Sequence, residues 1–314
     1  MIAGRWKEGL GMSDIGLVFS GGGGKGAYQI GVWKYLREIG LDRHVRGVSG
    51  TSVGALNAAL FVGSDYDTAE RMWRSISRDK ILSPRKLSFL DVAKWMNRVG
   101  YRYPDGDPGR WFVRTGMDIN PMMILFSMRE RLSSDYMFSR DGIEKMMKEC
   151  LDFAKIRRSS VPCYVTCFCL DRIRKERFCL NSFSDEDMIS LLLATSAIPI
   201  VFPSEEFYGK MYCDGGVPFL GDNVPVSPIY DSEVEDIIVV HLSQKGQVDK
   251  KRFPNARILE IIPSKDLGNA VSGTLDFSQE GVIERMELGY QDAKRMRPEL
   301  EALLYDSKYR ISRY

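Results

Sequence analysis

The sequence predicts an α/β fold, in which strands and helices alternate around one large core. An apolar run at residues 15–19 leads through a glycine-rich loop into a helical pattern over residues 27–39. A second apolar run at residues 45–48 leads through another glycine-containing turn into a helical segment at residues 55–60. The chain has 314 residues, 44% of them apolar, which is enough to bury one large core, and we expect a single domain.

The helix of the first unit is indicated by its apolar spacing. Ile30, Trp33 and Leu36 recur at every third residue, which places them on one face of a helix. Gly40 follows this pattern directly and is suited to end the helix.

The glycine loop before this helix permits three interpretations. Its residues are Gly21, Gly22, Gly23, Gly24, Lys25 and Gly26. A phosphate-binding P-loop requires Ser or Thr directly after its lysine, and Gly26 stands there instead. A dinucleotide fingerprint fits the glycine spacing, but its acidic residue should end the next strand, whereas Asp42 precedes that strand. The third interpretation is an oxyanion hole, because glycine amides at a helix N-terminus present positive dipoles to a developing negative charge.

The turn of the second unit has the form G-x-S-x-G, and its residues are Gly50, Thr51, Ser52, Val53 and Gly54. Between a strand and a helix, this pattern is typical of a nucleophile elbow, whose flanking glycines permit a turn that holds the serine oxygen clear of the backbone. An oxyanion hole is useful only beside a nucleophile, so the two units support each other. The sequence therefore predicts Ser52 as a nucleophile.

A serine hydroxyl needs a base to take its proton, and the chain offers two histidines and an aspartate for this role. His44 precedes the strand that leads to Ser52, so we expect it at the opposite end of the sheet. His241 ends an apolar run, and the order Ser52, Asp214, His241 is compatible with a catalytic triad. Asp214 ends another strand and leads into Gly215 and Gly216, which indicates either a positioned base or an ordinary Asp-Gly turn.

Taken together, the three motifs resemble the signatures of the patatin-like phospholipase family. They are the glycine loop, the serine turn and Asp214-Gly215-Gly216, in that order, and residues 194–199 and 273–277 support the match. The resemblance covers about residues 14–295. In the family an asparagine-proline stretch closely follows the aspartate, whereas here residues 217–222 intervene before Asn223. This insertion lies beside the expected site and is expected to affect access or acyl preference.

The resemblance implies a three-layer α/β/α fold with a mostly parallel central sheet. It also implies a catalytic domain over residues 14–295, after an N-terminal extension at 1–13 and before a basic tail at 296–314. Within it we expect a helical cap or lid at about residues 65–150. The implied activity is hydrolysis of phospholipid or lysophospholipid acyl esters through an acyl-enzyme. The implied roles are Ser52 as nucleophile, Asp214 as base and the glycine loop as oxyanion hole.

The charge distribution favours a lipid surface as partner. The net charge is only +2, which argues against nucleic-acid binding. Residues 71–114, however, contain eleven basic and four acidic residues together with Trp73, Trp95 and Trp111. Such a stretch is typical of peripheral binding to anionic headgroups, or else of a solvated cap whose tryptophans pack inward. A Met-rich run at 121–128 suits acyl-chain contact or the core.

The remaining features indicate a cytoplasmic protein without cofactor or metal. Four of the six cysteines, Cys163, Cys167, Cys169 and Cys179, lack metal-ligand spacing, and we expect them in the core of a reducing-compartment protein. No apolar run is long enough to span a membrane, and residues 1–11 lack a signal-peptide core. A C-terminal helix is expected to bury one face, formed by Ile283, Met286, Tyr290 and Ala293.

Three questions stay open at this point. Homo-oligomerisation is compatible with the sequence. The enzyme is a lipid hydrolase or, alternatively, a soluble carboxylesterase or thioesterase. From another class, the chain is a membrane-damaging effector kept silent until a ligand or partner acts on it.

Overall fold

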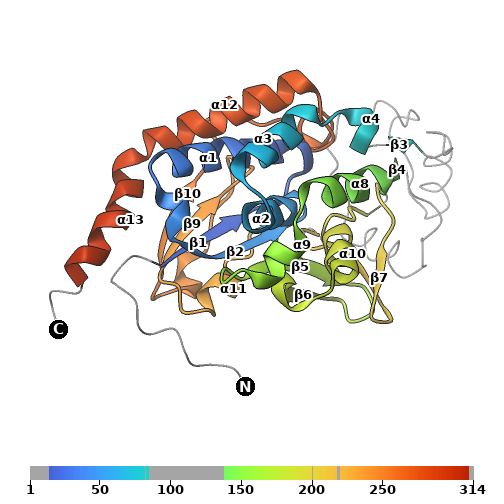
Figure 1. Ribbon diagram of the computed structural model, residues 1–314, viewed down its shortest axis with the longest axis horizontal. Coiled ribbons are helices and arrows are strands. Elements are labelled where there is room, and N and C mark those ends of the chain that lie inside the picture. Colours follow the sequence, from blue (N-terminus) through green and yellow to red (C-terminus); the bar gives the residue numbers. More distant parts are fainter. Residues whose placement is uncertain (1–13, 82, 85–137, 200, 218–219, 311–314) are drawn as a thin grey trace, which may run out of the picture.

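The computed structural model describes residues 14–81, 83–84, 138–199, 201–217 and 220–310, and it has the predicted α/β fold (Figure 1). An eight-stranded sheet has the order β10-β9-β1-β2-β5-β8-β7, with β6 also paired to β5. Its strands are β1 (Ile15–Phe19), β2 (Val45–Thr51), β5 (Cys163–Cys169), β6 (Arg174–Cys179), β7 (Glu205–Phe207), β8 (Lys210–Asp214), β9 (Asp236–Val240) and β10 (Arg257–Ile261). A separate pair is formed by β3 (Ser83–Pro84) and β4 (Phe138–Ser139).

The predicted mostly parallel character of the sheet is confirmed. The five strands from β10 to β5 run parallel to one another, and β6, β7 and β8 are antiparallel to their neighbours. Parallel strands need a crossover between them, and the long helices supply these crossovers.

Alternate side chains of each strand point to opposite faces of the sheet, and a separate hydrophobic core lies on each face. In β1, Leu17 and Phe19 belong to the larger cluster, whereas Val18 belongs to a smaller one on the other face. The larger cluster is covered by α1 (Ala27–Glu38), α2 (Val53–Gly63), α10 (Asp185–Thr195) and α12 (Gln279–Arg295). The smaller cluster is covered by the short α11 (Ser227–Tyr230) and by residues 248–256. Helices therefore cover the two faces unequally.

Further helices surround this frame. They are α3 (Tyr66–Ser75), α4 (Arg78–Ile81), α8 (Asp141–Cys150), α9 (Phe153–Arg158) and α13 (Arg297–Arg310), with the short turns η1 (Gly23–Gly26), η2 (Leu41–His44), η3 (Leu180–Ser182), η4 (Lys250–Arg252) and η5 (Ala270–Thr274). Part of the region expected to form the cap is therefore helical. Residues 85–137, which hold the loop at 101–109, Trp95, Trp111 and the Met-rich run, lie outside the described residues, as does the extension at 1–13.

The predicted inner face of the C-terminal helix was wrong at one position. Met286 and Ala293 are buried in α12, but Ile283 is 48% exposed. The buried stripe includes two charged residues, Arg285 and Asp292, which have partners inside the protein. Because Arg285 and Asp292 are charged, the spacing of apolar residues in the sequence does not place them on the buried face. In the predicted basic tail, α13 buries Leu300 and Leu303.

No helix in the described part of the chain has both the length and the apolar character needed to cross a bilayer.

Backbone contact between α1 and α12 predicts a destabilising substitution. The two helices lie side by side in Figure 1, and a Cβ atom at Gly31 would stand 1.8 Å from the Met286 carbonyl oxygen. Gly31→Ala is therefore expected to lower the free energy of unfolding by about 1–3 kcal/mol, although alanine favours a helix more than glycine. Urea unfolding measures this. An unchanged midpoint would mean that the helices are not packed this closely.

Candidate active site

The strand β5 brings the ends of β2 and β8 together. It pairs with β6 over residues 164–169, so β2 and β8 must both use its other edge. On that edge Thr51 of β2 pairs with Thr166, and Asp214 of β8 pairs with the next residue, Cys167. The two strands therefore meet end to end, and Ser52, which follows Thr51, lies next to Asp214.

Ser52 occupies the sharp turn predicted from the G-x-S-x-G pattern. Its backbone has φ 57° and ψ −130°, a conformation that costs a non-glycine residue about 1–3 kcal/mol. The flanking glycines permit the turn because the backbone crowds there. A Cβ at Gly50 would stand 2.2 Å from the Gly54 carbonyl oxygen, and one at Gly54 would stand 2.3 Å from the Phe19 carbonyl oxygen. Val53 then begins α2, so Ser52 lies at a helix N-terminus.

Ser52 and Asp214 form a buried pair. Their exposed fractions are 5% and 6%, and the Ser52 hydroxyl lies close enough to the Asp214 carboxylate to influence its pKa. The Gly216 amide donates to Asp214 Oδ1 at 2.7 Å, which fixes the carboxylate within the Asp-Gly-Gly turn. Burial raises the pKa of Asp214 to about 6, and the hydrogen bonds from Ser52 and Gly216 oppose that rise. The carboxylate is thus a stronger base than an ordinary aspartate.

The glycine loop lies beside this pair, and its amides are not equivalent. The Gly21 amide donates to the Asn223 carbonyl at 3.1 Å, and the Lys25 amide donates to the Gly22 carbonyl at 3.3 Å. Among the described residues, the amides of Gly22, Gly23 and Gly24 have no acceptor. Of the predicted oxyanion loop, these three amides are therefore the ones available to a bound group.

The Lys25 side chain of this loop packs against another segment, η5. Its Cε would be 2.5 Å from a Cβ at Gly273, so its stem packs against the η5 segment. Burial lowers the pKa of its ammonium group, while the charge of Asp266 raises it and Arg285 lowers it further.

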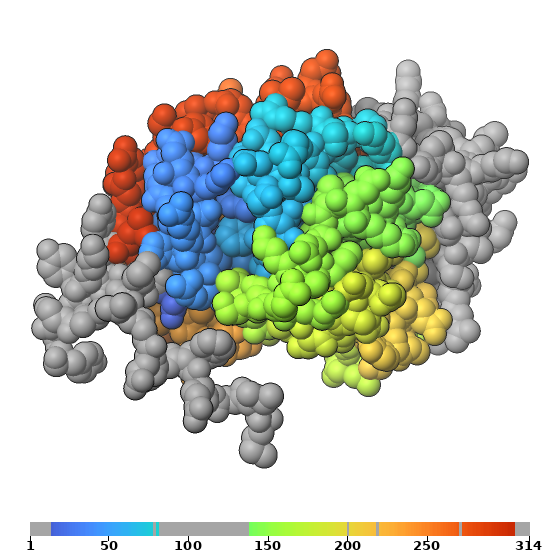
Figure 2. Space-filling model, viewed as in Figure 1, coloured from blue at the N-terminus to red at the C-terminus, as the bar shows by residue number. Residues whose placement is uncertain are grey.

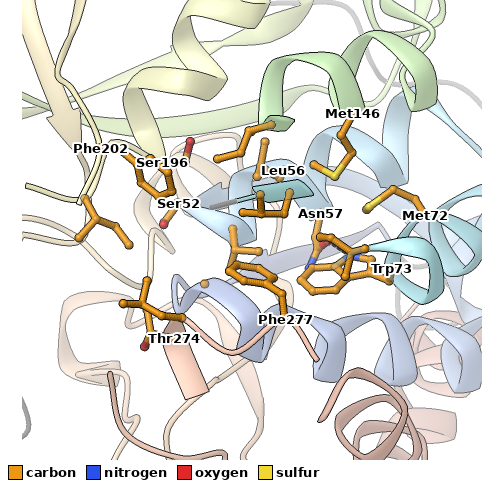
Figure 3. A pocket seen from close by; sticks show the side chains of 17 residues that line it. Ser52, Leu56, Asn57, Met72, Trp73, Met146, Ser196, Phe202, Thr274 and Phe277 are labelled. Carbon is orange, nitrogen blue, oxygen red and sulfur yellow. Dashed lines mark hydrogen bonds between the residues drawn. The ribbon is translucent and has the colours of Figure 1, made fainter. Parts of the chain in front are cut away.

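An apolar pocket of about 550 Å³, counting its open mouth, leads away from Ser52. Figure 3 shows Ser52, Ser196 and Phe202 toward one end, with Met72, Trp73 and Met146 toward the other. The walls come from the glycine loop and from α2, α3, α4, α8, the 196–202 segment and the η5 segment, and the lining residues are Gly23, Ser52, Val53, Leu56, Asn57, Met72, Trp73, Ile76, Ile81, Ile143, Met146, Ser196, Ile198, Phe202, Thr274, Leu275 and Phe277. The outer sides of α3 (cyan) and α8 (green) adjoin on the surface seen in Figure 2.

Neither histidine belongs to this pair. His44 ends η2, directly before β2, so the length of that strand separates it from Ser52. His241 is buried after β9, two strands away from β2 in the sheet, and its Nε2 lies 2.9 Å from Glu260 Oε2. Burial lowers the pKa of His241 despite this carboxylate. The geometry therefore favours Asp214 over His241 as the partner of Ser52.

The insertion after the Asp-Gly-Gly turn is hydrogen-bonded to residues next to Ser52 and Asp214. The Asp222 amide donates to the Gly215 carbonyl at 2.7 Å, and the Thr51 hydroxyl donates to the Asp222 carbonyl at 2.7 Å. Lys175 on β6 lies 2.8 Å from the Asp222 carboxylate. Residues 218–219 lie outside the described part of the chain. The effect of the insertion on access or acyl preference stays a prediction.

Two side chains near the pair had no role assigned from the sequence. Thr195 accepts a hydrogen bond from the Ser52 amide at 3.0 Å. Asn57 on α2 donates to the Gly26 carbonyl at 3.0 Å and accepts from Trp73 Nε1 at 2.9 Å. The Asn57 amide, which lies in the pocket wall, therefore has hydrogen-bond partners within the protein. Thr195 lies in a stretch that supports the family resemblance, but its contact joins residues 143 positions apart. Nothing in the local pattern indicates that contact.

Three of the four cysteines predicted to lie in the core are buried, whereas Cys179 on β6 is only half-buried. Cys163, Cys167 and Cys169 are buried on β5, and all six cysteines are free. Within the described residues no group of three or more His, Cys, Asp or Glu side chains is arranged to hold a metal ion.

The raised pKa of Asp214 gives a pH prediction. If Asp214 is the base, it must be ionised, so kcat/KM is expected to fall as the pH drops through about 6. Its nearest titratable neighbours, Cys167 on β5 and Cys213 on β8, do not ionise in this range, because burial raises the pKa of both thiols. A pH–rate profile on a soluble ester measures this. An acid limb near the ordinary aspartate value would contradict it.

A family model and several solved structures are similar to this chain. A family model described as patatin-like phospholipase matches residues 17–230. VipD from Legionella pneumophila shares the fold with a TM-score of 0.51 and 14% identity, over 96% of this chain and 72% of that one. Human GIVD cytosolic phospholipase A2 gives a TM-score of 0.48 and 10% identity, over 96% and 60% of the two chains. The ExoU–SpcU complex from Pseudomonas aeruginosa gives 0.41 and 16%, over 93% and 53%. No curated protein matches the chain in sequence.

Proposed function

The chain belongs to the patatin-like phospholipase family, and from that premise we propose that it hydrolyses acyl esters of phospholipids or lysophospholipids by a Ser52–Asp214 dyad. The observation that carries the proposal is the burial of Ser52 next to a carboxylate of raised pKa, beside an apolar pocket. A dry carboxylate whose pKa is close to neutrality is suited to accept and return a proton.

In the proposed acylation step, Asp214 accepts the Ser52 hydroxyl proton while Ser52 Oγ bonds to the ester carbonyl carbon. The carbonyl oxygen becomes an oxyanion, which the amides of Gly22, Gly23 and Gly24 are available to stabilise. As the tetrahedral intermediate collapses, the ester C–O bond breaks and Asp214 gives its proton to the departing alcohol.

In the proposed deacylation step, water attacks the acyl-enzyme and Asp214 accepts a proton from it. Collapse of the second intermediate breaks the bond to Ser52 Oγ, which takes the proton back, and the fatty acid is released. Asp214 thus acts in turn as base and acid, and each proton is returned within the cycle.

The pocket supports a long acyl chain as the substrate group. Its walls are formed mainly by aliphatic, methionine and aromatic side chains, and Asn57 already uses its polar atoms within the protein. An acyl chain in this pocket would exclude water from the carboxylate, which keeps its pKa raised. The proposed substrates are lipids presented at a membrane surface.

The test compares aggregated lipid with soluble esters. Fatty-acid release from phospholipid vesicles and lysophospholipid micelles, identified by mass spectrometry, is expected to exceed turnover of short soluble esters and thioesters. Turnover of the soluble esters alone would favour an esterase or thioesterase. No release from any of them, while Ser52 still reacts with a fluorophosphonate, would favour the ligand- or partner-regulated effector.

A substitution at the far end of the pocket tests acyl-chain binding. Met146 on α8 is half-buried, and Met146→Trp would fill space at the end opposite Ser196 and Phe202 (Figure 3). The rate for long-chain esters is expected to fall by about tenfold relative to short-chain esters, because overpacking excludes the chain terminus. The short-chain rate in the same variant is the internal control. An unchanged ratio would mean that the chain binds elsewhere.

A further inference from the structure

Thr195 connects the nucleophile turn to the central sheet. It is the last residue of α10, and its side chain is fully buried. Its hydroxyl accepts a hydrogen bond from the Ser52 amide at 3.0 Å and donates one to the Thr166 carbonyl of β5 at 2.6 Å. The Thr195 hydroxyl thus links Ser52, whose backbone is strained, to β5. This is the strand with which both β2 and β8 pair.

The same short segment also holds the other member of the pair. Two residues after Thr195, the Ala197 carbonyl accepts a hydrogen bond from the Asp214 amide at 2.9 Å. Residues 195–197 therefore contact the backbone of Ser52 through a side chain and that of Asp214 through a carbonyl. A shift of this segment changes the position of one relative to the other.

The strain at Ser52 explains why such a contact matters. A non-glycine residue with φ 57° persists only where its surroundings hold it in place. The glycines at 50 and 54 make room for this conformation but do not enforce it. The Ser52 amide, bonded to a buried hydroxyl, fixes the direction of the peptide plane that precedes the nucleophile.

We propose that Thr195 is a positioning residue, which holds the Ser52 backbone so that the serine hydroxyl stays aligned with the Asp214 carboxylate. The inference rests on the proposed Ser52–Asp214 dyad. Thr195 does not contact the reacting atoms in this account; it acts through the Ser52 amide. A displacement of about 1 Å in a reacting group can reduce a rate by about 100-fold, so the effect is measurable.

The decisive variant is Thr195→Val, which keeps the shape of the side chain and removes only the hydroxyl. It leaves the Ser52 amide and the Thr166 carbonyl without their partner. Thr195→Ser retains the hydroxyl. Ser184→Ala is the matched control for stability, because Ser184 caps the opposite end of α10 from Thr195 by accepting from the Asp187 amide at 3.1 Å.

The measurements are the rate of Ser52 labelling by a short alkyl fluorophosphonate, and kcat, KM and the pH profile for acyl-ester hydrolysis. Thr195→Val is expected to reduce the labelling rate and kcat by about 10- to 100-fold with little change in KM. Its acid limb is expected to move to higher pH, because a weaker hydrogen bond from Ser52 no longer lowers the pKa of Asp214. Thr195→Ser should restore the rate, and Ser184→Ala should lose stability with unchanged kinetics.

The outcomes separate the two proposals. If wild type releases no fatty acid but Ser52 is labelled, the lipid-hydrolase proposal fails, and the labelling rates still decide the role of Thr195. If Thr195→Val labels as fast as wild type, or loses only stability as Ser184→Ala does, the positioning role is overturned. A wild type that is not labelled at Ser52 overturns both.

Discussion

Replacing Ser52 by alanine is expected to abolish fatty-acid release, with a reduction of at least about 10⁴-fold in kcat. The reason is that, within the part of the chain that the structure describes, Ser52 is the residue of the elbow whose hydroxyl both adjoins the raised-pKa carboxylate and lines the apolar pocket. The measurement is fatty-acid release from phospholipid vesicles by the purified variant, together with labelling by a fluorophosphonate. Both signals should disappear.

A folded control is needed because Ser52 is buried. The variant keeps the glycines that permit the turn, so its circular dichroism and melting curve should resemble those of wild type. Fatty-acid release within tenfold of wild type by a folded Ser52→Ala protein would show that another group is the nucleophile.

Replacing Asp214 by asparagine is expected to reduce kcat by about 10²- to 10⁴-fold and, at the same time, to stabilise the fold. Asparagine has nearly the same shape and can still accept from the Gly216 amide, but it cannot accept the Ser52 proton. The activity loss and the stability gain have the same cause, which is the burial of an ionised carboxylate.

The sign of the stability effect follows from the raised pKa. A value of about 6 in the folded protein, against 3.8 for an ordinary aspartate, means that the folded state holds this proton more tightly. Ionisation above pH 6 therefore destabilises the fold by about 3 kcal/mol, and this cost disappears as the pH falls toward the ordinary value. At pH values well above 6, the Asp214→Asn protein is expected to have a higher melting temperature than wild type. This difference is expected to shrink as the pH is lowered.

Thermal melts of wild type and Asp214→Asn across this pH range measure the effect. A variant that is inactive and no more stable at alkaline pH would mean that Asp214 is not a buried, destabilised carboxylate. A variant that is more stable but fully active would remove Asp214 from the mechanism.

The local parts of the site could be predicted from the sequence because local backbone chemistry requires them. The Ser52 turn needs glycines where the backbone approaches within van der Waals contact, and only a few residues of sequence are needed to recognise it. The strand–loop–helix units at residues 15–39 and 45–63 follow from apolar spacing in the same way.

The long-range parts could not be predicted in this way. The meeting of β2 and β8 on one edge of β5 depends on pairing among three distant segments. The engagement of the Gly21 amide by Asn223 depends on the path of the insertion, and the contact of Thr195 with Ser52 depends on where α10 ends. Ile283 was assigned to the buried face because apolar spacing cannot show that Arg285 and Asp292 are buried in ion pairs and hydrogen bonds.

Fatty-acid release from phospholipid vesicles, measured for two variants beside wild type, distinguishes a Ser52–Asp214 dyad that works without histidine from a triad. The two variants are Asp214→Asn and His241→Gln, the second chosen because glutamine can keep the hydrogen bond to Glu260. We expect Asp214→Asn to release almost nothing and His241→Gln to release fatty acid at close to the wild-type rate. A folded His241→Gln protein that is inactive, beside an Asp214→Asn protein that is active, would contradict the dyad.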